Sequence, residues 1–291
     1  MAEKFAIKAR NVANVGSSKT AIIDLPVGKR YHNVILQVGY ASGTNTVVAA
    51  MTHVSEIRVL ANNRVQRVFS GTQLRDLNLL NGTEYDCQGL PNTAPGVSLP
   101  IFFAEPWRKD SASQDALAWD TSGFSSFRIE VDLGAVGTQT AASQTLTATC
   151  VVDNFRAANP QFVTVQRQQV AAAGTSFDIT TIERKGVLQQ VNFYPDSTND
   201  LQATIITVRR DGDIIRELPF ADNFALLVNN GMTPTASGRT DEMFDIVFDH
   251  DDLLNSSLVI EGAKELSFTV EAASAMAGSM TFLVSRLGRL L

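Results

Sequence analysis

The histidines of this sequence are its first candidates for chemistry, because imidazole binds metals and transfers protons near neutral pH. There are three, His32, His53 and His250, and all lie far apart in the chain. Metal sites of the cupin type draw on several histidines per domain, typically beginning with His-x-His, and that pair does not occur. The nucleophile elbow, the zinc-binding His-Glu-x-x-His helix and the glycine-rich phosphate loops are also absent. We therefore predict no catalytic and no cofactor-binding residues, and we expect the protein not to be an enzyme.

Scattered carboxylates are the second source of possible chemistry, since glycoside hydrolases place two acids on separate strands. The candidates are Glu130, Asp132, Glu261 and Glu271. Each alternates with apolar residues, which is typical of a solvated strand face. We favour that interpretation over catalysis.

An acidic segment near residues 241–252 is the best metal candidate. It contains Asp241, Glu242 and Asp245, followed by Asp249-His-Asp-Asp252. Oxygen ligands at this density could hold Ca²⁺, which accepts six to eight of them. The spacing matches no EF-hand loop, however, and a solvated acidic loop is the favoured interpretation. We assign no metal ligand here; a melting temperature unchanged by chelator would remove the calcium hypothesis.

Composition narrows the choice of function classes. The 291 residues are 44% hydrophobic and 19% charged, with a net charge of −6, which argues against binding nucleic acid through its phosphates. The two cysteines, Cys87 and Cys150, are too few for a disulfide framework. A single bridge between them is one alternative, and we favour two buried free thiols. No signal peptide and no run of ~20 apolar residues is present, so we expect a soluble protein made in the cytosol.

Alternation of apolar and polar residues is the dominant pattern, and it predicts half-buried β-strands. The clearest case is Phe127-Arg-Ile-Glu-Val-Asp-Leu133. Similar segments are residues 34–38, 56–60, 145–152, 203–208, 244–248, 266–272 and 280–284. Loops rich in Gly, Pro, Asn and Thr separate them, as expected for a β-sandwich or barrel.

Two regions of the chain repeat each other at a constant offset of 149 residues. Each has a tight hairpin, at Asn62-Asn63 and at Asp211-Gly212, followed by a predicted helix. The helices occupy residues 70–82 and 219–231 and end in Asn-Gly, where Gly82 supplies a left-handed stop for the first and Gly231 stops the second. Ser70 or Thr72 caps the first helix. One face of the second is shared by Phe220, Phe224, Leu227 and Val228. The superposition places Arg67 on Arg216 and Gly82 on Gly231 (216 − 67 = 149; 231 − 82 = 149).

The repeat predicts the architecture. We expect an all-β protein of two tandem eight-stranded antiparallel jelly rolls, with a short helix in each half. The N-terminal jelly roll would span residues 1–157 and the C-terminal one residues 158–291, with the join near Asn159-Pro160.

Basic and apolar residues alternate at the N-terminus, where Lys4, Lys8 and Arg10 surround Phe5 and Ile7, and the C-terminal residues 285–291 are similar. Such ends can pack on a neighbouring subunit, approach an anionic membrane or fray.

The chain resembles the double jelly-roll major capsid proteins of tailless icosahedral bacteriophages with an internal membrane, of the corticovirus type. The stretches that carry the similarity are residues 11–40, 54–82, 99–107 and 125–133 in the first half, and the order of elements in the second. The resemblance implies a homotrimer of six barrels, a pseudo-hexagonal tile of an icosahedral shell. It also implies contacts with neighbouring capsomers and minor capsid or vertex proteins, proximity to the membrane, no sequence-specific nucleic acid, and a place in the virion after assembly in the host cytoplasm.

Two alternatives remain open at the level of sequence. A carbohydrate-binding or adhesin β-sandwich would use Trp107 and Trp119 as a sugar platform, although buried Trp is commoner. A glycan-processing enzyme built of two jelly rolls is the second alternative.

Overall fold

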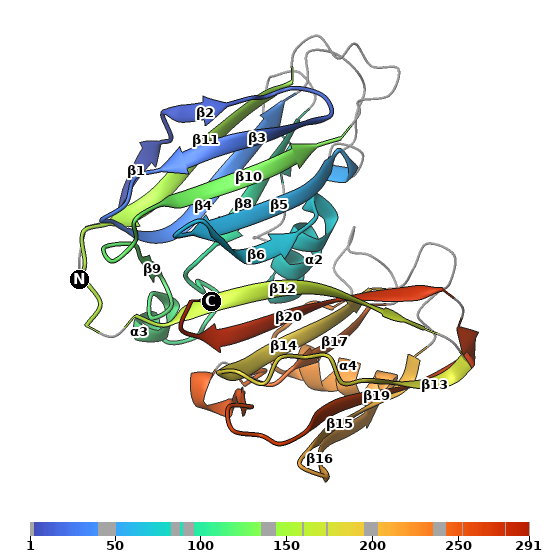
Figure 1. Ribbon diagram of the computed structural model, residues 1–291. Coiled ribbons are helices and arrows are strands. Elements are labelled where there is room, and N and C mark those ends of the chain that lie inside the picture. The colour runs from blue at the N-terminus through green and yellow to red at the C-terminus, as the bar shows by residue number, and fades with distance from the viewer. Residues whose placement is uncertain are drawn as a thin grey trace. The chain divides into compact units, whose positions relative to one another are not determined.

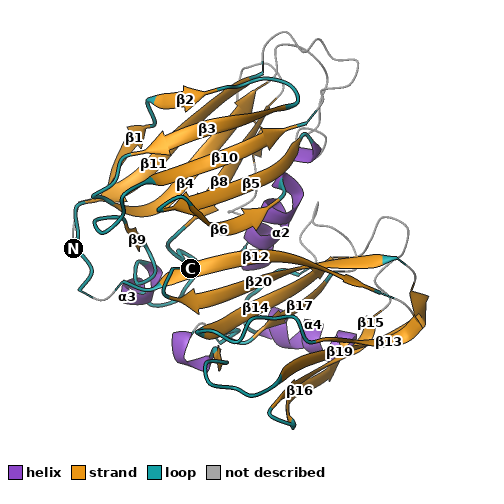
Figure 2. Cartoon of the chain, viewed as in Figure 1, coloured by secondary structure: helices purple, strands orange, loops and turns teal. Residues whose placement is uncertain are grey.

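The computed structural model describes residues 3–39, 51–82, 88–89, 96–134, 144–158, 160–172, 174–194, 203–234, 243–251, 253–276 and 278–290. The chain divides into two compact units, residues 1–162 with 289–291, and residues 163–288. Strands dominate both units (Figures 1 and 2).

The first unit is built from two antiparallel sheets. One has the order β1-β11-β4-β8-β7, with β9 beside β4, and the other the order β6-β5-β10-β3-β2. The elements are β1 Phe5–Lys8, β2 Asn11–Ala13, β3 Lys19–Leu25, β4 Arg30–Gly39, β5 Val54–Ala61, β6 Arg64–Phe69, α2 Gly71–Asn81, β7 Gln88–Gly89, β8 Gly96–Phe102, α3 Ser111–Gln114, β9 Trp119–Asp120, β10 Phe127–Leu133 and β11 Thr145–Asp153.

The second unit also has two antiparallel sheets. Their orders are β17-β14-β20-β12, with β18 beside β14, and β13-β19-β15-β16. The elements are β12 Phe162–Ala171, β13 Gly174–Ile179, β14 Val187–Tyr194, β15 Ala203–Arg210, β16 Asp213–Pro219, α4 Phe220–Asn229, β17 Phe244–Val247, the 3₁₀ helix Leu254–Ser256, β18 Leu258–Val259, β19 Leu266–Met276 and β20 Ser279–Gly288.

Eight strands of one unit correspond to eight of the other. Taken along the chain, β1, β3, β4, β5, β6, β8, β10 and β11 match β12, β13, β14, β15, β16, β17, β19 and β20. The sheet order β1-β11-β4-β8 then becomes β12-β20-β14-β17, and β3-β10-β5-β6 becomes β13-β19-β15-β16. Both units are therefore jelly rolls of the same connectivity, and the predicted fold class is confirmed.

The predicted hairpins form as expected from their turn residues. Asn62 and Asn63 have φ of 53° and 60°, and Asp211 and Gly212 have φ of 55° and 90°. Positive φ at both central residues matches the right-handed twist of the flanking strands. The offset of 149 residues separates both the first and the last residues of β5 and β15. It also separates the first residues of β6 and β16 and those of α2 and α4.

The two helices follow these hairpins, and their ends differ in detail. The Ser70 hydroxyl accepts a hydrogen bond from the Gln73 N–H, and the Gln73 side-chain oxygen accepts one from the Ser70 N–H, which forms a capping box on α2. Pro219 precedes α4 without a side-chain cap. Gly231 ends α4 with φ of 88°, but Gly82 has φ 144° and ψ 141°, so the predicted left-handed stop is wrong for α2.

Apolar side chains of the alternating strands fill each jelly roll. In β10, Phe127, Ile129, Val131 and Leu133 are all buried, while the residues between them are half-buried. Among the described residues, no helix combines the length and hydropathy needed to cross a membrane.

Candidate functional site

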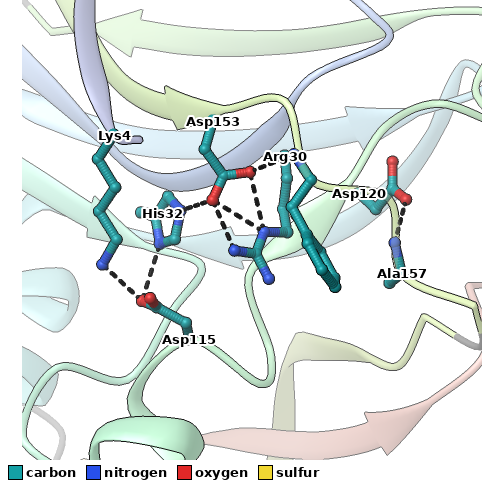
Figure 3. A network of polar contacts seen from close by, with 8 residues as sticks. Lys4, Arg30, His32, Asp115, Asp120, Asp153 and Ala157 are labelled. Atoms are coloured by element: carbon teal, nitrogen blue, oxygen red, sulfur yellow. Dashed lines mark hydrogen bonds and ion pairs between the residues drawn. The ribbon is translucent and has the colours of Figure 1, made fainter. Parts of the chain in front are cut away.

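A buried polar network in the first unit brings together groups that lie far apart in the sequence (Figure 3). His32 is on β4 and Asp153 ends the neighbouring strand β11. The pairing register shifts here, with Val151 opposite Asn33 and Val152 opposite Tyr31, so His32 is the extra residue of a β-bulge. A bulge re-aims the side chain it carries. In this case the imidazole turns toward carboxylates from two other segments.

Both imidazole nitrogens face carboxylates. His32 Nε2 lies 2.8 Å from Asp153 Oδ2, and Nδ1 lies 3.0 Å from Asp115 Oδ1, just after α3. Lys4 donates to the same Asp115 oxygen over 2.7 Å. The network therefore connects β4, β11, the α3 segment and the residue before β1.

Arg30 completes the network from the other side of Asp153. Its guanidinium donates from Nη2 over 2.5 Å and from Nε over 3.1 and 3.2 Å, which forms the two-pronged pair that Arg makes with carboxylates. Burial of Asp153 opposes its ionisation, but hydrogen bonds from Arg30, His32 and the Phe155 N–H outweigh burial and lower its pKa to about 2. Asp153 is therefore a fixed negative charge at neutral pH.

The carboxylates of this network already have cationic partners, which limits the chemistry open to them, although His32 Nδ1 makes no hydrogen bond among the described residues. Every carboxylate in it accepts hydrogen bonds or ion pairs from protein cations. Beside it, Asp120 accepts from the Ala157 N–H over 2.9 Å and fixes the chain after β11. No cluster of three or more His, Cys, Asp or Glu side chains in the described ranges has the arrangement of a metal site. The geometry is that of a structural clamp.

The carboxylates considered for catalysis do not form a pair. Glu130 and Asp132 lie on β10 and share Arg58 of β5 at 3.1 and 2.8 Å. Glu261 is in an exposed turn and Glu271 is exposed on β19, both in the second unit. Glu130, Asp132 and Glu271 thus lie on strands, as the favoured interpretation expected, whereas Glu261 lies in a turn and the predicted strand face is wrong for it.

The acidic segment is described only in part, because Asp241, Glu242 and Asp252 lie outside the described residues. Asp245 is buried on β17 and accepts from the Asn192 amide over 2.7 Å. Asp251 is partly buried, which opposes ionisation, but hydrogen bonds from Ser256 and the Leu253 N–H lower its pKa. Two of the acids thus have structural partners, and calcium binding stays an untested hypothesis beside the favoured interpretation of an acidic loop.

The remaining candidates from the sequence also have structural positions. Burial raises the pKa of the Cys150 thiol to about 12, so it is an inert core residue; Cys87 lies outside the described residues. Trp119 is fully buried among Phe103, Phe124 and Phe127, which rules it out as an exposed sugar platform. Trp107 is half-buried against Phe102.

The chain ends are parts of the two barrels where they are described. Residues Phe5–Lys8 pair with β11, and residues Ser279–Gly288 form β20. Arg286 is buried and pairs with Glu183. Fraying, one of the interpretations left open by the sequence, therefore does not apply to these residues.

An arginine on the strand before each helix supports the barrel in the same way in both units. Arg67 donates to the Phe102 carbonyl over 2.6 Å, and Arg216 donates to the Val247 carbonyl over 2.7 Å. These carbonyls end β8 and β17, which correspond. Two residues earlier, Asn78 of α2 and Asn223 of α4 bind the carbonyls of Pro100 and Asp245. The superposition of the repeats paired the arginines, but the sequence gives no sign of their acceptors.

Surface grooves differ between the units. In the first, a groove of about 910 Å³ is lined by residues 7–11 and 24–26, which include Lys8 and Arg10. In the second, a groove of about 620 Å³ is lined by β16, α4, β18 and the segment before β18. Sequence reasoning missed the second groove, because a shared apolar face on α4 does not show which of its residues stay exposed.

Comparison with known proteins supplies the family. The model of the viral coat protein P2 N-terminal domain matches residues 6–153, and that of the P2 C-terminal domain matches residues 162–290. A search of curated protein sequences finds no match.

Solved structures of viral capsid proteins share the fold over nearly the whole chain. The major capsid protein P2 from Bacteriophage PM2 has 16% identity and a TM-score of 0.76, covering 98% of this chain and 97% of that one. The major capsid protein of STIV has 10% identity and a TM-score of 0.69, covering 99% and 97%. The PBCV-1 virus capsid model has 8% identity and a TM-score of 0.65, covering 98% and 93%.

The resemblance to double jelly-roll capsid proteins is thereby confirmed. The enzyme alternative is wrong, because coat proteins of this family are structural. The two matched domains correspond to the two jelly rolls described above. The chain belongs to the viral coat protein P2 family, and its place is the virion capsid.

Proposed function

We propose that this viral major capsid protein forms a homotrimer that serves as one pseudo-hexagonal tile of an icosahedral shell. The observation that carries the proposal is the identical strand order of the two units. Three chains around a threefold axis supply six similar barrels, and six similar units can pave a surface as hexagons do. A closed threefold ring satisfies the contacts between its three chains and leaves the outer edges of the tile for neighbouring tiles.

The experiment is a mass measurement of the purified full-length chain by size-exclusion chromatography with light scattering. The expected mass is three times the chain mass of 31.5 kDa. A stable monomer or dimer at micromolar concentration would contradict the trimer. Electron microscopy of the same sample tests the hexagonal outline.

We also propose that the basic end of the first unit lies near an internal membrane, and that the tile contacts neighbouring capsomers and minor capsid or vertex proteins. Lys8 and Arg10 are exposed and line one groove, which suits anionic headgroups. Co-sedimentation with vesicles containing anionic lipid tests the membrane contact. Binding that is unchanged in Lys8→Glu/Arg10→Glu would remove it.

The boundary between the two jelly rolls belongs to the same proposal, at residues 157 and 158. It is supported by the family matches, which end at 153 and resume at 162. We assign no catalytic, cofactor-binding or metal-binding residue, in keeping with a tile whose purpose is to associate. Limited proteolysis that cuts first inside either unit would argue against the boundary.

A further inference from the structure

Large apolar side chains are exposed on three elements of the second unit. They are Ile214 and Ile215 on β16, Phe220 and Val228 on α4, and Val259 on β18, with exposed fractions between 36% and 54%. β16 is also the edge strand of its sheet within the unit. An exposed apolar edge is a site for association unless another surface covers it.

All three elements border the groove of about 620 Å³, which we call the β16/α4 groove. Ile215, Leu226, Phe248 and Val259 supply apolar wall, and Arg216 and His250 supply polar wall. Ser257 also lines the groove and is 6% exposed. Its hydroxyl has no hydrogen-bond partner among the residues that the structure describes. Since a buried hydroxyl without a partner is costly, the groove is suited to an occupant that brings a polar group as well as apolar contacts.

The corresponding helix of the first unit is more deeply buried. Nine of the 11 residues of α2 are buried, against two of the 10 residues of α4. Both helices pack on corresponding strands, α2 on β5, β6 and β8, and α4 on β15, β16 and β17. The two helices therefore differ in exposure although they occupy corresponding places in the two jelly rolls.

Equivalent positions in the two units show the same contrast. Ile215, Arg216 and Leu226 correspond to Gln66, Arg67 and Leu77, at the offset of 149 residues. Gln66, Arg67 and Leu77 are all buried. The guanidinium of Arg67 lies 4.9 Å from the ring centroids of both Phe103 and Trp119, whereas Arg216 is half-buried and faces the groove. The second unit thus places an exposed isoleucine where the first has a buried glutamine.

We propose that the β16/α4 groove binds a second copy of this chain. The inference rests on the proposed homotrimer and assigns its lateral contact to named residues. In a shell built from copies of one chain, the abundant neighbour is another copy, and a threefold ring joins unlike surfaces head to tail. The groove on one repeat and the buried counterpart on the other give the two repeats unlike surfaces, as a head-to-tail contact requires. The incoming copy supplies an apolar or aromatic side chain against Arg216 and a hydrogen-bonding group for Ser257.

The test compares neighbouring residues of one strand. Ile215→Glu and Val259→Glu place a charge in the groove, whereas Ile214→Glu changes an exposed residue of β16 that does not line it. Sedimentation of the full-length chain measures the trimer, and circular dichroism with thermal melting checks that each variant is folded. We expect the two groove variants to dissociate at concentrations at least tenfold above those of wild type and of Ile214→Glu.

The outcomes separate the inference from the function on which it rests. Wild type, Ile215→Glu and Val259→Glu that remain equally trimeric would keep the trimer and overturn the groove as its contact, leaving another capsid component as the occupant. A wild-type chain that is monomeric at every concentration would overturn both. Equal dissociation of folded Ile214→Glu would also contradict the groove, because it would make the effect one of net charge on β16.

Discussion

At the scale of single residues, Asp153 has the strongest electrostatic role that the structure defines. Its buried carboxylate accepts from Arg30, His32 and the Phe155 N–H. Replacement by Asn keeps the shape but leaves Arg30 without its counter-charge. Breaking a buried pair from one side costs about 3 kcal/mol or more. We therefore expect Asp153→Asn to lower the free energy of unfolding by about 3 kcal/mol at pH 7, measured by urea denaturation at one protein concentration.

The same carboxyl predicts a pH dependence with a definite sign. Its pKa falls from 3.8 to about 2 on folding, although burial alone would raise it. The unfolded chain then binds the proton first as the pH falls, so the contribution is complete above about pH 5 and is lost between about pH 4 and pH 2. The contribution is on the order of 2 kcal/mol. Wild type should lose that much stability over this interval, and Asp153→Asn should show a shallower decline.

A matched control is Asp24→Asn, which removes an exposed ion pair with Arg128 at 2.8 Å. Exposed pairs contribute about 0–1 kcal/mol, so the two variants should differ clearly. Equal losses in Asp24→Asn and Asp153→Asn, or the same acid slope in wild type and Asp153→Asn, would contradict the clamp.

Residue-level prediction from sequence succeeded where the surroundings are local. Alternation in β10 was enough to place Glu130 and Asp132 on an outer face, because side chains of a strand point to opposite faces in turn. It failed for His32, whose partner Asp153 is 121 residues away and which faces it only through a β-bulge. No spacing in the sequence encodes a bulge or a contact between strands that lie more than 100 residues apart in the chain.

At the scale of elements, the hairpins and helix boundaries were predictable because turn and cap residues act within a few positions. Asn62-Asn63, Asp211-Gly212 and the Ser70 cap all formed as the sequence indicated. For α4 the sequence indicated the apolar face but not its exposure. Its periodicity was read correctly, but Phe220 and Val228 are exposed, since what covers a helix depends on other segments or other molecules.

Gly186, just before β14, gives an element-scale prediction. It has φ of 71°, and a Cβ placed there would lie 2.5 Å from the Leu287 carbonyl oxygen on β20. Gly186→Ala must therefore both adopt a strained backbone and push two paired strands apart. We expect it to lower the free energy of unfolding by about 3 kcal/mol, from about 1 kcal/mol of backbone strain and the remainder from the clash.

Gly212→Ala separates these two effects. Gly212 has φ of 90°, but a Cβ there would meet no atom within 4 Å. Its loss should be only the backbone strain of about 1 kcal/mol. Urea denaturation of both variants measures the difference, and equal losses would show that the approach of β14 to β20 is not tight.

At the scale of the whole molecule, the duplication was readable because the hairpin and helix units kept a constant spacing while their side chains diverged. Equal connectivity of two barrels then follows, since strand order is inherited with the fold. What the repeat could not reveal was that the two copies have unequal surfaces. Gln66 and Ile215 occupy equivalent positions, yet one is buried and the other exposed. That difference arises only when the chain is folded, and it gives the two repeats the unlike surfaces that a head-to-tail contact requires.

A chain that associates head to tail into a trimer is more stable against unfolding at higher protein concentration, because association removes folded monomer from the unfolding equilibrium. For three chains, a tenfold rise in concentration adds about 0.9 kcal/mol per chain. For a chain of 291 residues that shift corresponds to a Tm increase of about 1–2 °C. We expect calorimetry to show this rise for wild type and for Ile214→Glu, and to show none for Ile215→Glu in the range where it is monomeric. A wild-type Tm that stays constant over a hundredfold range of concentration would mean that the barrels unfold without help from their neighbours.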